Sequence, residues 1–281
     1  MSGRCAELSE AAGELLSATA VTARSWLLLE VPGTWPRDVV DGGVLPEAAE
    51  EAVSAWLDET PGSRLQFVRR PGRAAGSLLA FVVRAEEAAG SVRRIQLEAH
   101  DDLSALDLAS AGEPMDNSLV LVCGHGTRDR CCALRGTAVY TALAERLGED
   151  EVWISSHQGG HRFAANVLVL PAGIQFGRVV AEQAAFLVAR ALAGRIDLAH
   201  YRGRTCYEPR VQAAERLIRE EGGFEGVGDL RLIDASDGTV RFRAWDGSEY
   251  AAKVEQISGP AVPASCGAEP EPQRAFAARL L

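Results

Sequence analysis

The sequence Leu119-Val-Leu-Val-Cys-Gly-His-Gly-Thr-Arg-Asp-Arg-Cys-Cys132 joins a short apolar run to a loop that carries cysteines and a histidine. An apolar run of this length, bounded by glycine, is typical of a buried strand. A second strand-like run, Val152–Ser155, leads directly into Ser156-His-Gln-Gly-Gly-His161. Both polar segments therefore follow strands, and functional sites in α/β sheets gather at the carboxyl ends of strands.

The elements around these segments predict an α/β fold. A strand at 119–123, a helix at 133–147, strands at 152–155 and 166–171, and a helix at 178–193 follow one another. This is the order of a thioredoxin-like unit, in which the first two strands are parallel. A similar order occurs earlier, with strands at 26–31, 64–69 and 77–84 and a helix after Pro46. We therefore expect two related thioredoxin-like units, a degenerate one at 1–112 and a second at 113–205.

The remaining segments predict a helix over about 6–20 and a small C-terminal α+β extension at 206–281. In the extension, a helix at 209–221 ends at two glycines, and short strands alternate with Asp-Gly turns. The stretch Gly259–Gln273 is rich in proline and alanine, and we expect it to lie on the surface.

Composition excludes several classes of protein. The 281 residues carry 29 basic and 39 acidic side chains, a net charge of −10, which argues against nucleic-acid binding as the main function. Lys253 is the only lysine. No apolar run approaches the roughly 20 residues that a membrane helix needs, and the acidic start lacks the core of a signal peptide. We expect a cytoplasmic protein whose six cysteines are thiols or metal ligands.

Two thiolates and two imidazoles make a complete ligand set for a metal or an iron–sulfur cluster. Cys123 is separated from Cys131 and Cys132 by seven and eight residues, wider than the cysteine pairs of zinc fingers. Two histidines in place of two cysteines on one iron is the Rieske arrangement. Rieske motifs each combine one cysteine with one histidine, whereas here the cysteines and the histidines occupy separate segments.

The two motifs together resemble the sucrase/ferredoxin-like family, as do Phe176-Gly-Arg-Val179 and Ser265-Cys-Gly267. The resemblance implies a thioredoxin-like ferredoxin that binds a [2Fe–2S] cluster. Its ligands would be Cys123, Cys132, His157 and His161, with Cys131 as the alternative to Cys132. No carboxylate pair suits glycoside hydrolysis, and no catalytic residue is assigned. The implied role is one-electron transfer to a redox partner protein, or redox sensing, rather than stand-alone catalysis.

Two other functions use the same residues. One is a zinc-binding Cys2His2 protein, and the other is a thiol oxidoreductase that uses Cys131 and Cys132, although it lacks the usual C-x-x-C motif. Of the surrounding residues, we expect Asp129 and Arg128 to fix the loop. The remaining expectations are that His125 is a polar loop residue, that Trp35 and Trp153 pack in the core or at its edge, and that Cys5, Cys206, His100 and His200 are structural or surface residues.

Overall fold

The computed structural model describes residues 4–40, 42–72, 76–148 and 150–281. The helices are α1 (Cys5–Ala11), α2 (Glu47–Glu59), α3 (Arg130–Ala144), α4 (Ala181–Leu192) and α5 (Pro209–Gly222), with 3-10 turns at His100–Ala105, His161–Phe163 and Val227–Asp229. The strands are β1 (Ser25–Glu30), β2 (Ser63–Arg69), β3 (Leu78–Ala85), β4 (Gly90–Leu97), β5 (Glu113–Met115), β6 (Leu119–Cys123), β7 (Val152–Ser155), β8 (Val167–Leu170), β9 (Ile174–Phe176), β10 (Tyr201–Arg204), β11 (Leu230–Ser236), β12 (Thr239–Ala244), β13 (Glu249–Pro263) and β14 (Pro270–Leu280).

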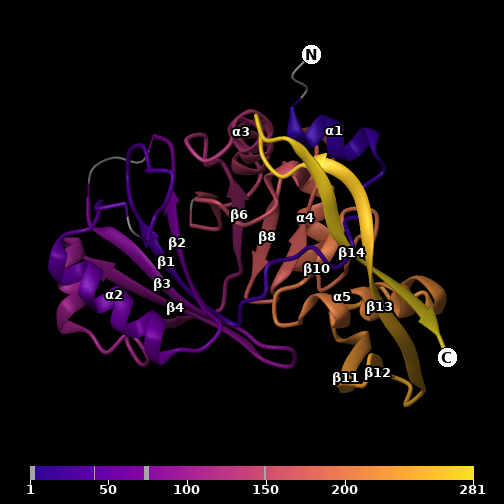
Figure 1. The fold of residues 1–281 in the computed structure, drawn as a ribbon. Helices are drawn as coiled ribbons and strands as arrows, with labels where there is room; N and C mark the ends of the chain where they lie inside the picture. The colour runs from indigo at the N-terminus through magenta and orange to yellow at the C-terminus, as the bar shows by residue number, and fades with distance from the viewer. Residues whose placement is uncertain (1–3, 41, 73–75, 149) are drawn as a thin grey trace.

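Ten strands form one mixed sheet in the order β10-β9-β8-β6-β7-β2-β1-β3-β4-β5. In one half, β1 pairs in parallel with β2 and antiparallel with β3, which pairs with β4. In the other half, β6 pairs in parallel with β7 and antiparallel with β8, which pairs with β9. The halves join where β2 meets β7, and they lie side by side in Figure 1. The mixed α/β class and the parallel pairing of the first two strands in each half are confirmed.

The helices cover the sheet through apolar faces. Val139 of α3 and Leu187 of α4 pack in one buried cluster with Val120 and Val122 of β6. In the first half, Trp56 of α2 packs in a second buried cluster with apolar residues of β1 and β2. Every residue of β6 is buried, as its unbroken apolar sequence predicts for a central strand.

The sheet is strongly curved, which brings its two halves together on the other face. Phe81 on β3 contacts Trp153 on β7 edge to face with ring centroids 5.6 Å apart, although β1 and β2 lie between these strands. Trp153 and Trp35 are both buried, so their expected packing in the core is confirmed.

The C-terminal region consists of α5 and a four-stranded antiparallel sheet in the order β11-β12-β13-β14. The stretch Gly259–Gln273 does lie mostly at the surface, and most of it belongs to a long hairpin of β13 and β14. β12 pairs only with the first residues of β13, so the far end of the hairpin is two-stranded. Prolines are tolerated at such free edges, where no ladder hydrogen bond is lost.

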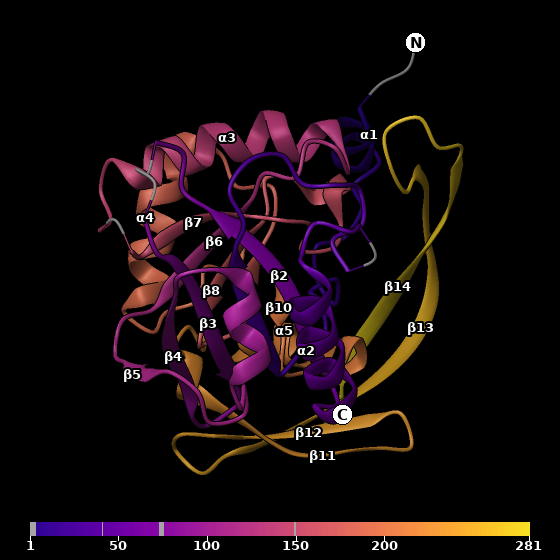
Figure 2. The ribbon, with the colours of Figure 1, turned by 90° about the vertical axis from the view of Figure 1, so that its left-hand side faces the viewer.

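The N-terminal helix is shorter than predicted. α1 ends at Ala11, and Gly13 follows with a φ of 64°, so the helix over 6–20 is wrong beyond that point. Figure 1 and Figure 2 both show α1 beside the tip of the β13–β14 hairpin, near the start of α3. None of the described helices is long and apolar enough to cross a membrane.

Candidate metal centre

Cys123 and Cys132 meet where β6 gives way to α3. Cys123 is the last residue of β6, and Cys132 lies in the first turn of α3. The carboxylate of Asp129 caps that helix by accepting a hydrogen bond from the Cys131 backbone N–H at 2.8 Å. Gly136 lets α3 approach the strand closely, because a Cβ there would overlap the Cys123 carbonyl oxygen. Both thiols are completely buried.

His157 and His161 lie in the loop that follows β7. Between them, Gly159 and Gly160 have φ values of 86° and 69°, a conformation that favours glycine. The resulting turn brings the two imidazole rings to a centroid separation of 4.9 Å. Both histidines are half-buried.

The structure brings three of the four predicted residues together and places His161 beside them. The donor atoms of Cys123, Cys132 and His157 lie within 4.8 Å of one another, and His161 adjoins them through its ring contact with His157. Among the described residues, Nδ1 of His157 and both ring nitrogens of His161 are buried without a hydrogen-bond partner. Such atoms cost free energy unless another group satisfies them. Two thiols beside orphaned imidazole nitrogens fit a metal ion or an iron–sulfur group.

The two buried thiols share their protons unequally. A hydrogen bond from Cys132 holds the pKa of Cys123 well below its usual range; burial opposes this effect, and the neighbouring His157 adds to it. The same hydrogen bond, together with burial, raises the pKa of Cys132 well above its usual range. Cys123 is therefore the more acidic thiol of the pair, and the thiolate is the form that binds metals.

His125 orients His157, a contact that the sequence analysis missed. Its Nδ1 accepts a hydrogen bond from the His157 backbone N–H at 3.1 Å, and its Nε2 lies 2.8 Å from the Pro36 carbonyl oxygen. These contacts require a neutral ring that carries its proton on Nε2. Burial lowers the pKa of His125 and favours that form. The only sequence signal was its position two residues after Cys123.

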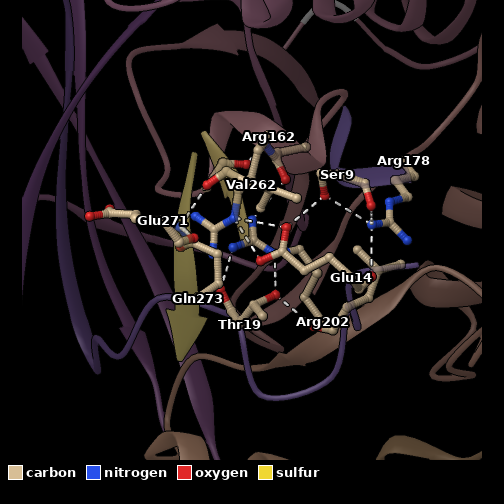
Figure 3. Close-up of polar contacts among 12 residues, drawn as sticks. Ser9, Glu14, Thr19, Arg162, Arg178, Arg202, Val262, Glu271 and Gln273 are labelled. Carbon is tan, nitrogen blue, oxygen red and sulfur yellow. Dashed lines mark hydrogen bonds and ion pairs between the residues drawn. The ribbon is translucent and has the colours of Figure 1, made fainter. Parts of the chain in front are cut away.

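Arg202 is a second positioning residue that the sequence analysis missed, and nothing in its local sequence marks it. Its buried guanidinium donates to the Gly159 carbonyl at 3.0 Å and to Oδ1 of Asn166 at 2.7 Å. Asn166 in turn donates to the Gly160 carbonyl at 3.0 Å. Burial lowers the pKa of Arg202 to about 9. Figure 3 shows Arg202 beside Thr19, whose hydroxyl accepts a further bond. The arginine therefore ties the glycine turn to the N-terminal segment.

The segment after α1 supports the same loop from outside. Glu14 forms an ion pair with Arg162 at 2.7 Å and accepts a hydrogen bond from the Ser9 hydroxyl at 2.7 Å (Figure 3). Arg178 donates to that hydroxyl at 3.1 Å. Because Arg162 follows His161 directly, these contacts fix the end of the histidine loop.

Cys131 contacts different partners from its neighbour Cys132. Its sulfur lies 3.6 Å from that of Cys5 and 3.4 Å from that of Cys266. Cys5 is buried, which agrees with a structural residue, and its sulfur reaches that of Cys131 because α1 packs against the start of α3. Asp129 fixes this region as expected, accepting backbone N–H groups of Cys131 and Cys266 at 2.8 and 2.9 Å. The hydrogen bond from Cys5, opposed by burial, lowers the pKa of Cys131 to about 6.

A family model described as sucrase/ferredoxin-like matches residues 16–203. Altered inheritance of mitochondria protein 32 of Eremothecium gossypii is 34% identical over 106 residues, which cover 33% of this chain and 34% of that protein. The protein of the same name from Clavispora lusitaniae is 33% identical over 100 residues, 33% of this chain and 37% of that protein. The aligned region thus spans about a third of the length of each relative.

No solved structure matches the chain significantly. The family model, in contrast, spans most of the chain and includes both the cysteine segment and the histidine loop. The protein therefore belongs to the sucrase/ferredoxin-like family.

Proposed function

We propose that the protein binds a [2Fe–2S] cluster through Cys123, Cys132, His157 and His161 and serves in electron transfer or redox sensing. The observation that carries the proposal is the meeting of two buried thiols with buried imidazole nitrogens that have no hydrogen-bond partner among the described residues. Membership of a ferredoxin-like family supports iron and sulfide as the bound group. A bound cluster would supply one-electron chemistry, with imidazole ligands raising its potential.

The surrounding residues of the chain hold the ligand side chains in place and set their proton positions. His125 fixes the backbone at His157, and Arg202 fixes the glycine turn. Oδ2 of Asp129 lies 3.9 Å from Nε2 of His161 and would favour a proton on that nitrogen. Nδ1 of His161 would then be the nitrogen available to a bound group. A proton retained near a carboxylate would allow the ring to couple electron gain to proton gain.

We further propose that the chain consists of two thioredoxin-like units, 1–112 and 113–205, followed by an α+β extension at 206–281. The matching strand pairing of the two halves of the ten-stranded sheet supports this division. Only the second unit carries the cysteine and histidine motifs, which supports a degenerate first unit.

The proposal includes a redox partner protein that docks near His157. That ring lines a surface pocket of about 310 Å³ together with Arg37, Arg64 and Arg128. These arginines stand out in a protein of net charge −10 and support a partner whose docking surface is acidic at this point. The free thiols of all six cysteines support a reducing compartment such as the cytoplasm.

The adjacent cysteines of α3 provide a matched pair of variants. Iron, acid-labile sulfide and the visible spectrum are measured on protein purified without oxygen. Cys132→Ser should lose the iron and the colour, because one buried ligand is removed. Cys131→Ser should retain both, because its sulfur lies in the other group. Retention of the cluster by Cys132→Ser and its loss in Cys131→Ser would contradict the ligand assignment.

The same preparation tests the other functions. If the purified protein contains zinc and no iron at this site, the site is a zinc-binding Cys2His2 centre and not an iron–sulfur centre. Thiol–disulfide exchange that depends on both Cys131 and Cys132 would support an oxidoreductase. Their sulfurs contact different groups, which does not favour that chemistry.

A further inference from the structure

A second group of thiols lies at the point where three distant parts of the chain meet. Cys5 begins α1, Cys131 lies in the first turn of α3, and Cys266 lies in the turn between β13 and β14. Cys5 and Cys131 are 126 residues apart in the chain, and Cys131 and Cys266 are 135 apart. Cys5 and Cys266 fall outside residues 16–203, the part of the chain that the family model matches.

The three sulfurs form a nearly equilateral triangle. The separations are 3.6 Å for Cys5 to Cys131, 3.4 Å for Cys131 to Cys266 and 3.6 Å for Cys266 to Cys5. Thiolates bound at about 2.3 Å to one tetrahedral zinc lie about 3.8 Å apart. The triangle is therefore within a few tenths of an ångström of the spacing that a single ion requires.

Asp129 stands at the fourth corner. Its Oδ1 lies 3.3 Å from the Cys266 sulfur and 3.8 Å from the Cys5 sulfur. A carboxylate oxygen and a thiolate on one tetrahedral zinc are separated by about 3.5 Å. The backbone N–H groups of Cys131 and Cys266 hold the carboxylate in this position.

The surroundings exclude water and leave the donors in place. Cys5 and Cys131 are at most 1% exposed, Asp129 is 5% exposed, and Cys266 is half-buried at the edge. Ala6 and Ala164 complete the apolar wall around the sulfurs. A disulfide would use only two of these three sulfurs. A single metal ion can bind all three.

We propose that Cys5, Cys131, Cys266 and Asp129 form a second metal site that binds one thiophilic divalent ion, with Zn²⁺ as the best match. Three soft sulfurs and one oxygen in tetrahedral array suit zinc rather than magnesium or calcium, which take oxygen ligands at higher coordination number. Binding deprotonates the thiols and releases their protons to solvent. The ion joins α1, α3 and the hairpin, and its Asp129 ligand also faces His161 at 3.9 Å.

This site is independent of the proposed cluster because it shares no ligand with it. Neighbouring side chains on a helix point in different directions, so Cys131 and Cys132 serve different centres. Cys131→Ser should lose zinc and keep iron, and Cys132→Ser should lose iron and keep zinc. Either proposal can therefore be contradicted without contradicting the other.

The first test maps zinc onto individual cysteines of the full-length, reduced, metal-free protein. Zn²⁺ is added, the thiols are alkylated, and each cysteine is followed by mass spectrometry. We expect zinc to slow the alkylation of Cys5, Cys131 and Cys266 together, while Cys206 remains unchanged. Protection confined to Cys123 and Cys132, or no protection of the three, overturns the proposal. This readout needs no variant to fold.

The second test measures affinity by competition with a chromophoric zinc chelator. Cys266→Ser should bind one equivalent fewer than the wild-type chain, or bind it more than about 100-fold more weakly, since loss of an outer-shell partner alone costs about 10- to 100-fold. Cys206→Ser is the matched control, because this buried cysteine belongs to neither group. Equal zinc binding by Cys266→Ser and the wild type overturns the proposal. The absorption spectrum of the Co²⁺-loaded protein provides a second readout. Bands typical of tetrahedral thiolate coordination should be weaker in Cys266→Ser than in the wild type.

Discussion

The His125 ring makes two hydrogen bonds, and different substitutions of His125 remove one bond while keeping the other. Nδ1 accepts the His157 backbone N–H at 3.1 Å, and Nε2 meets the Pro36 carbonyl at 2.8 Å. In His125→Asn the amide oxygen occupies the place of Nδ1 and keeps the bond to His157. In His125→Gln the amide nitrogen occupies the place of Nε2 and keeps the bond to Pro36.

The expected loss of stability follows from these contacts. Each hydrogen bond contributes about 0.5–1.5 kcal/mol, and either amide variant loses one bond and also the ring contact with Trp35, so each should lose about 1–3 kcal/mol. His125→Ala loses both bonds and the edge-to-face contact with Trp35, whose ring centroid lies 5.7 Å away. That contact contributes about 0.5–1.5 kcal/mol, and the sum for alanine is about 1.5–4.5 kcal/mol.

Two measurements separate stability from positioning. Urea unfolding of the metal-free chain at neutral pH gives the loss of free energy, and iron per chain after anaerobic purification reports the state of the metal centre. His125→Asn and His125→Gln should be destabilised by similar amounts. The iron content should fall in His125→Gln, because the His157 backbone is released, and should stay near the wild-type value in His125→Asn.

His200→Asn is the control, because His200 is half-buried and both its ring nitrogens also make hydrogen bonds, to Gly177 and Gln183. It should lose a little stability and no iron. The reasoning is refuted if His125→Asn and His125→Gln retain equal iron, or if His125→Ala loses less than about 0.5 kcal/mol.

Three further substitutions probe the framework. Tyr201 donates to Glu215 at 2.6 Å, and burial, then Glu215, raise its pKa well above the usual value. The folded protein therefore keeps a proton that the unfolded chain loses above about pH 10, so Tyr201 should contribute about 1.4 kcal/mol per pH unit to the fall in stability there. Tyr201→Phe, unfolded by urea between about pH 8 and 11, should lack this contribution. Gly136→Ala should push α3 away from Cys123, cost about 1–3 kcal/mol in the same assay and lower the iron content. Arg202→Met should cost about 2–5 kcal/mol and lower the iron content, because buried acceptors in the histidine loop lose their donor.

For each of these variants, one result would contradict the expectation. An unchanged alkaline slope in Tyr201→Phe would mean that this phenol ionises in the folded state. Gly228→Ala adds a Cβ that meets no atom within 4 Å and should leave stability unchanged. If Gly136→Ala costs no more stability than Gly228→Ala, the packing argument for Gly136 is wrong. Arg210 is exposed, so Arg210→Met should leave iron content unchanged. Full iron content in Arg202→Met would show that the glycine turn holds without its arginine.

The sequence alone determined those features that local patterns encode. The unbroken apolar run of β6 specified a buried strand. The cysteine and histidine segments identified the family and the types of donor. Each of these signals lies within about a dozen consecutive residues, where spacing and hydrophobicity are sufficient to predict the structure.

The tertiary structure decided which of these residues meet. Cys131 and Cys132 are adjacent and chemically identical, and only the packing of α1 and the hairpin separates their partners. The contacts of Arg202 with the Gly159 carbonyl and of His125 with Pro36 join segments 43 and 89 residues apart. No local periodicity encodes such contacts, because they arise only when distant elements bury their apolar faces against each other and bring the remaining polar groups together.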